Sequence, residues 1–156
     1  MSYDTGLSLD ELREYLEKEG IQPSYQRLKI LEYIMNHRTH PTVDIIYKNL
    51  SKGIPTLSKT TVYNTLKLFV SKGIVQELTI EEKEVRYDAD TTQHAHFKCI
   101  ECGGVYDVAL EYTIVELGTV TEEGHKVIDC QVYLKGICKD CLRKHKIQLK
   151  TIVDAE

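Results

Sequence analysis

Apolar residues recur every three or four positions through the first 73 residues of the chain, the spacing of amphipathic helices. Each stripe follows a side chain that can cap a helix N-terminus, and Gly20 and Gly73 are expected to end the first and last helices. The pattern therefore predicts four helices. Their expected caps are Ser8 (with Glu11 as a capping box), Ser24, Thr42 and Ser58. Their expected buried residues are Leu9, Leu12, Leu16, Leu28, Leu31, Ile34, Met35, Val43, Ile46, Tyr47, Leu50, Val62, Leu66 and Phe69.

The pattern then changes to short runs that alternate between apolar and polar residues. Residues 74–80 and 84–90 predict two strands joined by the charged link 81–83. Helices followed by a two-stranded ribbon are the layout of a winged helix-turn-helix, which would occupy residues 1–88. Residues 89–93 show no periodicity and are interpreted as a hinge.

The second half of the chain mixes strand and helix patterns. Strands are expected at 94–99 and 103–109, followed by a helix from 109 to about 122, although Gly118 and several β-branched residues weaken that helix. Residues 125–138 alternate most clearly, and a basic helix follows from 139 to about 150. We therefore expect an α+β protein in which residues 94–156 form a small α/β domain. The apolar face of the clearest strand would carry Ile128, Cys130, Val132 and Leu134.

Composition and charge narrow the class of protein. With 42% hydrophobic and 28% charged residues the chain can form a packed core. No apolar run approaches the roughly 18 residues of a membrane span, and the polar N-terminal segment lacks the layout of a signal peptide, so a cytoplasmic protein without a membrane partner is expected. Residues 24–73 carry eight Lys/Arg and two acids (+6), against −10 for the rest of a chain of net charge −4. This asymmetry indicates either a basic module or a solvated lysine-rich surface.

Four of the five cysteines form two C-x-x-C pairs that are separated by 35 residues: Cys99, Cys102, Cys138 and Cys141. This spacing is typical of a structural zinc site with four thiolate ligands. A redox-active dithiol and buried free cysteines are the alternatives, and two matched pairs favour zinc. Four thiolates fill a tetrahedral zinc, so the nearby histidines are not needed there.

His94 and His96 are two residues apart, so in a strand both imidazoles point to the same face. They are candidate ligands of a second metal ion, with Asp88 and Asp107 as nearby carboxylates. Imidazole and carboxylate together suit Fe(II), Mn(II) or Zn(II). Surface histidines or hydrogen-bonded core histidines are the alternative, and the pair alone does not decide between them.

Residues 58–72 are a candidate recognition helix, because such a helix presents the side chains near its N-terminus to base edges and phosphates. Asn64 and Tyr63 would read bases, while the hydroxyls would position the helix on phosphates. An ordinary polar helix face is the alternative. The candidate DNA-binding residues are Arg27, Ser58, Lys59, Thr60, Thr61, Tyr63, Asn64 and Lys67.

Several short motifs occur along the chain in this order: Gln26-Arg27, His40-Pro41-Thr42, Thr61-Val62-Tyr63 with Leu66, Gly73-Ile74-Val75, Arg86-Tyr87-Asp88, His94-x-His96, C-x-x-C-G-G and the closing G-x-C-x-x-C. Taken together, these motifs resemble the ferric uptake regulator family from about Leu9 to Cys141. The resemblance implies a homodimeric, metal-dependent repressor that binds double-stranded DNA at a palindromic operator, with a winged-helix domain, a hinge and an α/β dimerisation domain.

Within the family the chain is similar to peroxide-sensing regulators, because Asp88 and Asp107 stand where iron-sensing relatives commonly carry glutamate. This resemblance implies a regulatory Fe²⁺ or Mn²⁺ ion beside the structural Zn²⁺. It also implies that bound iron reacts with hydrogen peroxide and that oxygen is added to His40 or His94, after which the metal is lost and repression ends. Mn²⁺ would bind without this chemistry. There is no turnover, so no enzyme is expected. The implied ligands are His40, Asp88, His94, His96 and Asp107.

The implied ligands come from both halves of the chain and from its hinge. A metal bound to all of them would fix the orientation of the two halves, and so the spacing of two recognition helices in a dimer. The metal-free protein would sample other spacings and bind DNA more weakly.

Cys130 departs from the family pattern. Relatives often carry a histidine of a further metal site at this position, so that site is not expected in this chain. The place of Cys130 on an apolar strand face predicts a packed core thiol instead. His37, His125 and His145 match no ligand position.

Three alternative functions use some of the same features. A reversible iron, manganese or zinc uptake regulator would use the same five ligands. A zinc hydrolase would need an open metal position, but the chain has no H-E-x-x-H motif, and five protein ligands leave little room for both water and substrate. A zinc ribbon that only mediates protein contacts leaves the basic half unexplained.

Overall fold

The computed structural model describes residues 6–81 and 83–154, and side chains as far as Lys146. The start of the polar N-terminal segment, Glu82 of the charged link and the last two residues lie outside the described residues. The chain divides into two compact units, residues 1–91 and 92–156. Among the described residues, no helix is long and apolar enough to cross a membrane.

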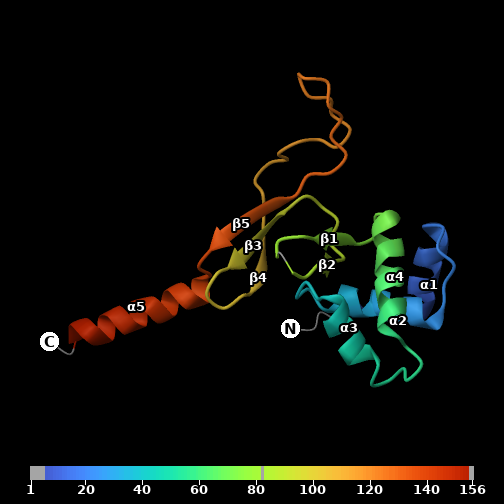
Figure 1. Ribbon diagram of the computed structural model, residues 1–156, viewed down its shortest axis with the longest axis horizontal. Helices are drawn as coiled ribbons and strands as arrows, with labels where there is room; N and C mark the ends of the chain where they lie inside the picture. Colours follow the sequence, from blue (N-terminus) through green and yellow to red (C-terminus); the bar gives the residue numbers. More distant parts are fainter. Residues whose placement is uncertain (1–5, 82, 155–156) are drawn as a thin grey trace. The chain divides into compact units, whose positions relative to one another are not determined.

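The first unit begins with the four predicted helices, α1 (Leu9–Lys18), α2 (Tyr25–Asn36), α3 (Val43–Leu50) and α4 (Lys59–Ser71) (Figure 1). Each helix begins directly after its predicted cap, whose hydroxyl accepts a hydrogen bond from the backbone N–H three residues later. The capping box of Ser8 and Glu11 is also confirmed. Such caps stabilise a helix by roughly 1 kcal/mol each, so these boundaries are set locally.

The apolar stripes of the four helices form the core of the first unit. Most of the predicted residues are buried, and the others pack against them while remaining half-buried. Thr65 is also buried, which the pattern of apolar residues did not predict. The fully or nearly fully buried side chains that were predicted are Leu12, Leu16, Leu28, Leu31, Ile34, Ile46, Val62, Leu66 and Phe69.

A two-stranded antiparallel ribbon follows, formed by β1 (Gln76–Leu78) and β2 (Arg86–Asp88). Strand β2 is also fastened to the chain before α3, because the Tyr87 N–H donates to the Pro41 carbonyl over 3.0 Å and Thr42 forms a bridge with Arg86. This pairing brings His40 and Asp88 together.

The second unit is a three-stranded mixed sheet followed by a helix. Strand β3 (Ala95–Cys99) lies in the middle, antiparallel to β4 (Val105–Val108) and parallel to β5 (Val132–Gly136). The closing helix is α5 (Lys139–Asp154). The predicted α+β class is confirmed.

The helix predicted from 109 to 122 is wrong. These residues, all described, form turns and bends, and an isolated bridge joins Val120 to Lys126. Gly118 has a φ of 90°, outside the helical region, and its N–H donates to the Val127 carbonyl over 2.7 Å. The β-branched residues around it have low helix propensity, so the helical pattern is overridden by a local chain reversal.

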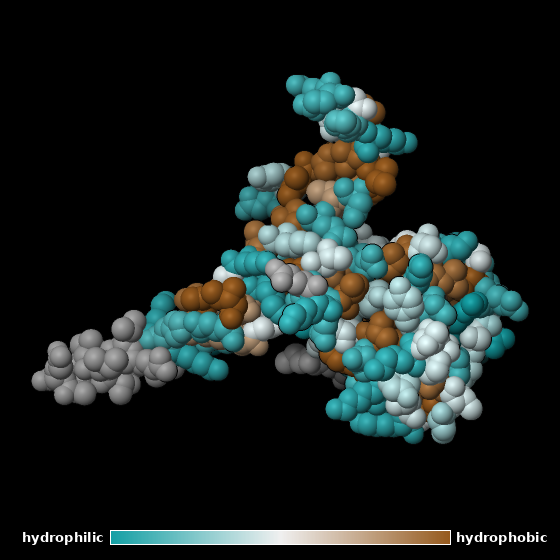
Figure 2. All heavy atoms as spheres, viewed as in Figure 1, coloured by the Kyte–Doolittle hydropathy of each residue, from teal (hydrophilic) through white to brown (hydrophobic). Residues whose placement is uncertain are grey.

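The strand predicted at 125–138 is shortened to β5, and its predicted apolar face is largely exposed among the described residues. Ile128 is 81% exposed, Leu134 is 42% exposed and Cys130 is half-buried, so the prediction of Cys130 as a packed core thiol is wrong. Figure 2 shows apolar side chains gathered on the segment between β4 and β5.

Candidate functional site

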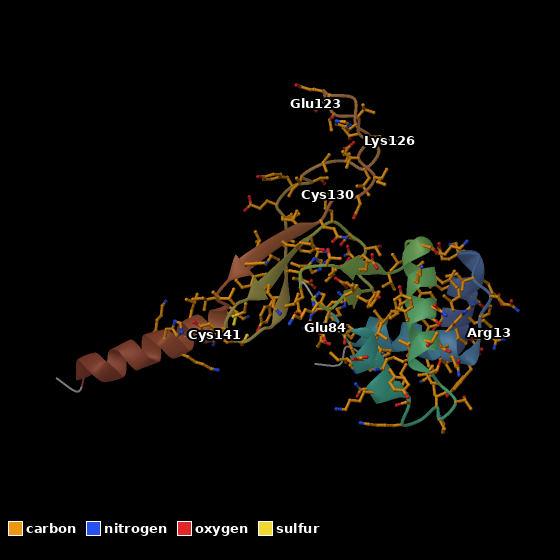
Figure 3. All side chains as sticks on the ribbon, viewed as in Figure 1. Arg13, Glu84, Glu123, Lys126, Cys130 and Cys141 are labelled. Atoms are coloured by element: carbon orange, nitrogen blue, oxygen red, sulfur yellow. The ribbon has the colours of Figure 1, made fainter. Side chains whose placement is uncertain are left out.

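Four cysteines meet at one end of the sheet in the second unit. Cys99 is the last residue of β3, and Cys102 follows in a turn for which Gly103 takes a left-handed φ of 73°. Cys138 precedes α5 and Cys141 lies in its first turn, as Figure 3 shows for Cys141. Because β5 runs parallel to β3, both pairs reach the same end of the sheet.

The distances between the sulfur atoms fit a tetrahedral metal site. Cys99 Sγ lies 3.9 Å from Cys141 Sγ, Cys102 Sγ lies 3.8 Å from Cys138 Sγ, and all four sulfurs lie within 4.8 Å of one another. A disulfide would need about 2.05 Å. Four thiolates about 2.3 Å from a zinc ion are about 3.8 Å apart, so the donor set fits zinc in both chemistry and spacing.

Hydrogen bonds favour the thiolate form of two of the four cysteines, Cys99 and Cys138. The backbone N–H groups of Cys102 and Cys138 lower the pKa of Cys99 to about 6, and that of Cys141 lowers the pKa of Cys138. The hydrogen bond with Cys138, together with burial, raises the pKa of Cys141 to about 12. Four neighbouring thiolates repel one another, so full ionisation requires a cation among them.

Tyr106 is a neighbour of the cluster that the sequence did not reveal. Its hydroxyl lies 3.7 Å from Cys102 Sγ and 3.8 Å from Cys138 Sγ. No motif distinguishes this tyrosine from an ordinary strand residue.

Histidine and aspartate side chains form a group in each unit. In the first unit His40 Nε2 lies 3.4 Å from Asp88 Oδ2, and both side chains are buried. His40 has a φ of 54°, an uncommon value for a residue with a side chain. The guanidinium of Arg86 donates to the His40 carbonyl over 3.1 Å and so helps to hold this conformation.

In the second unit His94 and His96 both approach Asp107. Their Nε2 atoms lie 3.1 Å and 3.4 Å from Asp107 Oδ1, and their rings are 4.4 Å apart. His96 is paired with Asp107 across strands β3 and β4, while His94 Nδ1 lies 2.8 Å from the Thr92 carbonyl. Metal-binding histidines usually use one ring nitrogen for such a carbonyl and the other for the metal.

Two other histidines, His37 and His145, have different surroundings. His37 stacks on Tyr33 and its Nδ1 lies 2.8 Å from the Tyr33 carbonyl, while His145 Nε2 lies 3.0 Å from Glu101 Oε1. Neither belongs to the two His/Asp groups.

The candidate DNA-binding residues lie on and beside α4. Ser58 caps this helix, and Tyr63 is 50% exposed. Lys59 forms a 3.0 Å ion pair with Asp44. Arg27 is half-buried, and its guanidinium donates to the Gln22 carbonyl over 2.7 Å. Thr60, Asn64 and Lys67 are exposed, and Arg27, Thr61 and Asn64 line one cavity between α2 and α4.

Comparison with known proteins identifies the class. The family model described as the ferric uptake regulator family matches residues 18–135. The chain therefore belongs to this family of metal-responsive transcription regulators, and it is not an enzyme. The family membership also excludes the zinc hydrolase considered from the His/Asp residues. Repressors of this family bind DNA and act as dimers.

The relatives narrow the class further. The chain is 37% identical over 137 residues to the peroxide operon regulator of Bacillus subtilis, covering 87% of this chain and 94% of the relative. It is 35% identical over 141 residues to the peroxide-responsive repressor PerR of Staphylococcus aureus, covering 87% and 93%. A solved structure of the Helicobacter pylori ferric uptake regulator has the same fold, with a TM-score of 0.63, 19% identity and coverage of 87% and 95%.

Replacing one clustered cysteine tests the zinc site. Cys138→Ser is expected to remove zinc and to unfold much of the second unit, because a thiolate ligand is lost from a site that joins β3 to α5. Zinc per chain, measured by plasma mass spectrometry, and far-UV circular dichroism would report both effects. Cys130→Ser is the matched control, since Cys130 lies outside the cluster. Equal zinc in the two variants would contradict the site.

Proposed function

We propose that the chain is a metal-dependent DNA-binding repressor that senses hydrogen peroxide through oxidation of a ligand histidine. The main support for this proposal comes from two groups of histidine and aspartate side chains. One group is His40 with Asp88, and the other is Asp107 with His94 and His96. The names of the Bacillus subtilis and Staphylococcus aureus relatives support the peroxide signal. Cytoplasmic localisation is part of the proposal, since the five cysteines form no disulfide with one another.

The first unit is proposed to be a winged-helix DNA-binding domain over residues 1–88. In this arrangement α4 enters the major groove, β1 and β2 form the wing, and residues 89–93 serve as the hinge to the dimerisation domain at 94–156. The exposed face of α4 supports this assignment, because Tyr63 and Asn64 lie where a recognition helix meets base edges.

The five histidine and aspartate ligands are proposed to bind one regulatory ion. The set contains three imidazoles and two carboxylates, which suits Fe(II) or Mn(II). His40 and Asp88 belong to one unit and the other three ligands to the next. Binding by all five would restrict how the units move, and in a dimer it would set the distance between the two α4 helices to match a palindromic operator.

The regulatory ion determines whether the protein responds to peroxide. Bound Fe(II) would activate hydrogen peroxide, so that one peroxide oxygen replaces a C–H hydrogen of an imidazole and the other leaves as water, with the imidazole as the net two-electron donor. Mn(II) would not activate peroxide in this way. His40 and His94 are the imidazoles expected to take up an oxygen atom. An oxygenated imidazole binds metal poorly, so the two units would be released from their fixed orientation and the repressor would leave DNA.

The cysteine cluster is proposed to hold a structural zinc ion. Its four sulfurs join the end of β3 to the start of α5, and 35 residues of chain separate the two C-x-x-C pairs. The role is structural because four protein ligands leave no open position on a tetrahedral ion.

A second copy of the chain is proposed to cover the apolar segment between β4 and β5. An uncovered group of this kind marks an interaction surface in a soluble protein. The side chains that a dimer would bury there include Tyr112 (76% exposed), Leu117 (61%), Val120 (60%) and Ile128 (81%).

Peroxide sensing is tested under anaerobic conditions. Zinc-containing protein is loaded with Fe(II) or Mn(II) and treated with equimolar hydrogen peroxide, and DNA binding is measured beside peptide mass spectrometry. Trypsin releases His40 in peptide 39–48, separate from His37, and His94 with His96 in peptide 87–98. We expect a mass gain of about 16 Da at His40 or His94 in the iron sample only, together with loss of DNA binding.

The manganese sample and the peptide that holds His125 are the controls for that experiment. If both histidines stay unmodified and DNA binding follows metal concentration, the protein is a reversible iron, manganese or zinc uptake regulator.

Substitutions on α4 test the recognition helix. A duplex is first selected from a random palindromic library with the metal-loaded protein. Asn64→Ala is expected to cost about 1–3 kcal/mol of binding free energy and to relax the preference for one base of the operator. Lys67→Ala is expected to lower the affinity for all DNA sequences equally and to reduce the slope of log K against log salt concentration by about 1. Lys18→Ala, on the exposed end of α1, should leave both quantities unchanged. Unaltered affinity and salt slope in the α4 variants would place DNA elsewhere.

The dimer surface is tested by adding charge to it. Leu117→Glu combined with Ile128→Glu is expected to shift the zinc-containing protein from dimer to monomer in sedimentation velocity, because two carboxylates would be buried without partners. Tyr25→Glu adds a charge at a 58% exposed position of the first unit and should remain dimeric. A dimer that survives the double substitution would refute this surface.

A further inference from the structure

The four cysteines of the zinc site differ in their exposure. Cys99, Cys138 and Cys141 are buried, whereas Cys102 is exposed. Cys102 is therefore the sulfur that solvent and thiol reagents reach first. The hydroxyl of Tyr106 lies 3.7 Å from this sulfur and 3.8 Å from Cys138 Sγ, within hydrogen-bonding range for sulfur.

The backbone fixes the place of the Tyr106 ring. Tyr106 is paired with Phe97 across β3 and β4, one position before Asp107. Its ring lies against Gly104, where an added Cβ would come within 2.6 Å of the Tyr106 hydroxyl and 2.9 Å of two ring carbons. The Gly104 N–H also donates to Cys102 Sγ over 3.4 Å. A glycine at 104 thus leaves room for the phenol beside the sulfur.

The chemistry of this contact follows from the groups involved. A phenol keeps its proton at neutral pH and can donate it, and a zinc-bound thiolate is an acceptor. Hydrogen bonds to charged acceptors are stronger than those between neutral groups. Donation to a thiolate withdraws charge from the sulfur, which makes it a weaker nucleophile and holds it in place. Groups around a metal site commonly orient its ligands in this way.

We propose that Tyr106 is a positioning residue of the zinc site, whose hydroxyl holds Cys102 beside Cys138 and slows both the departure of Cys102 from the metal and its reaction with thiol reagents. This inference rests on the zinc site proposed above. The Tyr106 hydroxyl meets the cysteine sulfurs on the strand face opposite to that of the Asp107 side chain, so the effect is separate from peroxide sensing at histidine.

The hydroxyl can be removed while the ring is kept. Tyr106→Phe is compared with wild type and with Tyr133→Phe, which removes a hydroxyl that donates to Gln131. Each full-length protein is purified, its zinc content is measured, and it is treated with N-ethylmaleimide in the presence of a chromogenic zinc chelator. We expect equal initial zinc in all three, with alkylation and zinc release about five-fold or more faster in Tyr106→Phe alone.

Three further measurements locate the alkylated sulfur and distinguish the loss of a hydrogen bond from a change in packing. Fragment ions of tryptic peptide 99–126 should place the first alkylation on Cys102 rather than Cys99. In the cobalt-substituted protein, the sulfur-to-metal charge-transfer band should shift in Tyr106→Phe and stay fixed in Tyr133→Phe. Incorporation of 3-fluorotyrosine at position 106, a stronger donor of nearly the same size, should slow alkylation relative to wild type even if Tyr106→Phe fails to fold.

Different experimental outcomes would overturn the role of Tyr106 and the zinc site itself. Wild-type protein purified without zinc overturns both. Zinc present in full, with unchanged rates in Tyr106→Phe and in the fluorotyrosine protein, overturns the role of Tyr106 and leaves the zinc site intact. A folded Tyr106→Phe that loses zinc, while Tyr133→Phe keeps it, supports the role.

Discussion

The second unit depends on what holds its four cysteine sulfurs together, because it has little other buried core. Its buried cluster among the described residues consists of Cys99, Cys138 and Cys141, with Phe97 and Ile137 packed against them. The first unit has sixteen buried residues in its cluster. Small domains with few buried side chains commonly rely on a metal for stability. A zinc ion would therefore replace hydrophobic packing as the main source of order in this unit.

The pairing register of β3 and β4 positions side chains at both candidate metal centres. In the ladder between β3 and β4, His96 faces Asp107, and the next pair is Phe97 with Tyr106. Neighbouring residues of a strand point to opposite faces, so Asp107 approaches the histidines while Tyr106 approaches the cysteines. A slip of one residue would exchange the two faces and remove both arrangements at once. The two centres are thus coupled through backbone hydrogen bonds even though their ligands are distinct.

The features that could be predicted from the sequence are those set by contacts between residues close together in the chain. Ser8, Ser24, Thr42 and Ser58 mark the helix starts because a hydroxyl and its N–H partner are three residues apart in the chain. The helix predicted from 109 to 122 was wrong because the Gly118 N–H donates to the Val127 carbonyl, nine residues away, in a chain reversal that the helical pattern does not reveal. Tyr106 was missed because its contact with Cys102 requires the strand pairing and the space left by Gly104. The place of His40 beside Asp88 likewise follows from β2, and only the family resemblance indicated it.

The backbone conformation of His40 lowers the stability of the fold, whereas its imidazole is a proposed metal ligand. His40 is the one non-glycine residue with a positive φ in the described ranges 6–81 and 83–154, and such a conformation costs of order 1–3 kcal/mol for a residue with a side chain. Glycine or asparagine would relax the chain at this position but would remove an imidazole. Directed evolution for heat resistance alone would thus favour exchanging this histidine, and a more robust protein obtained in that way would be a poorer sensor.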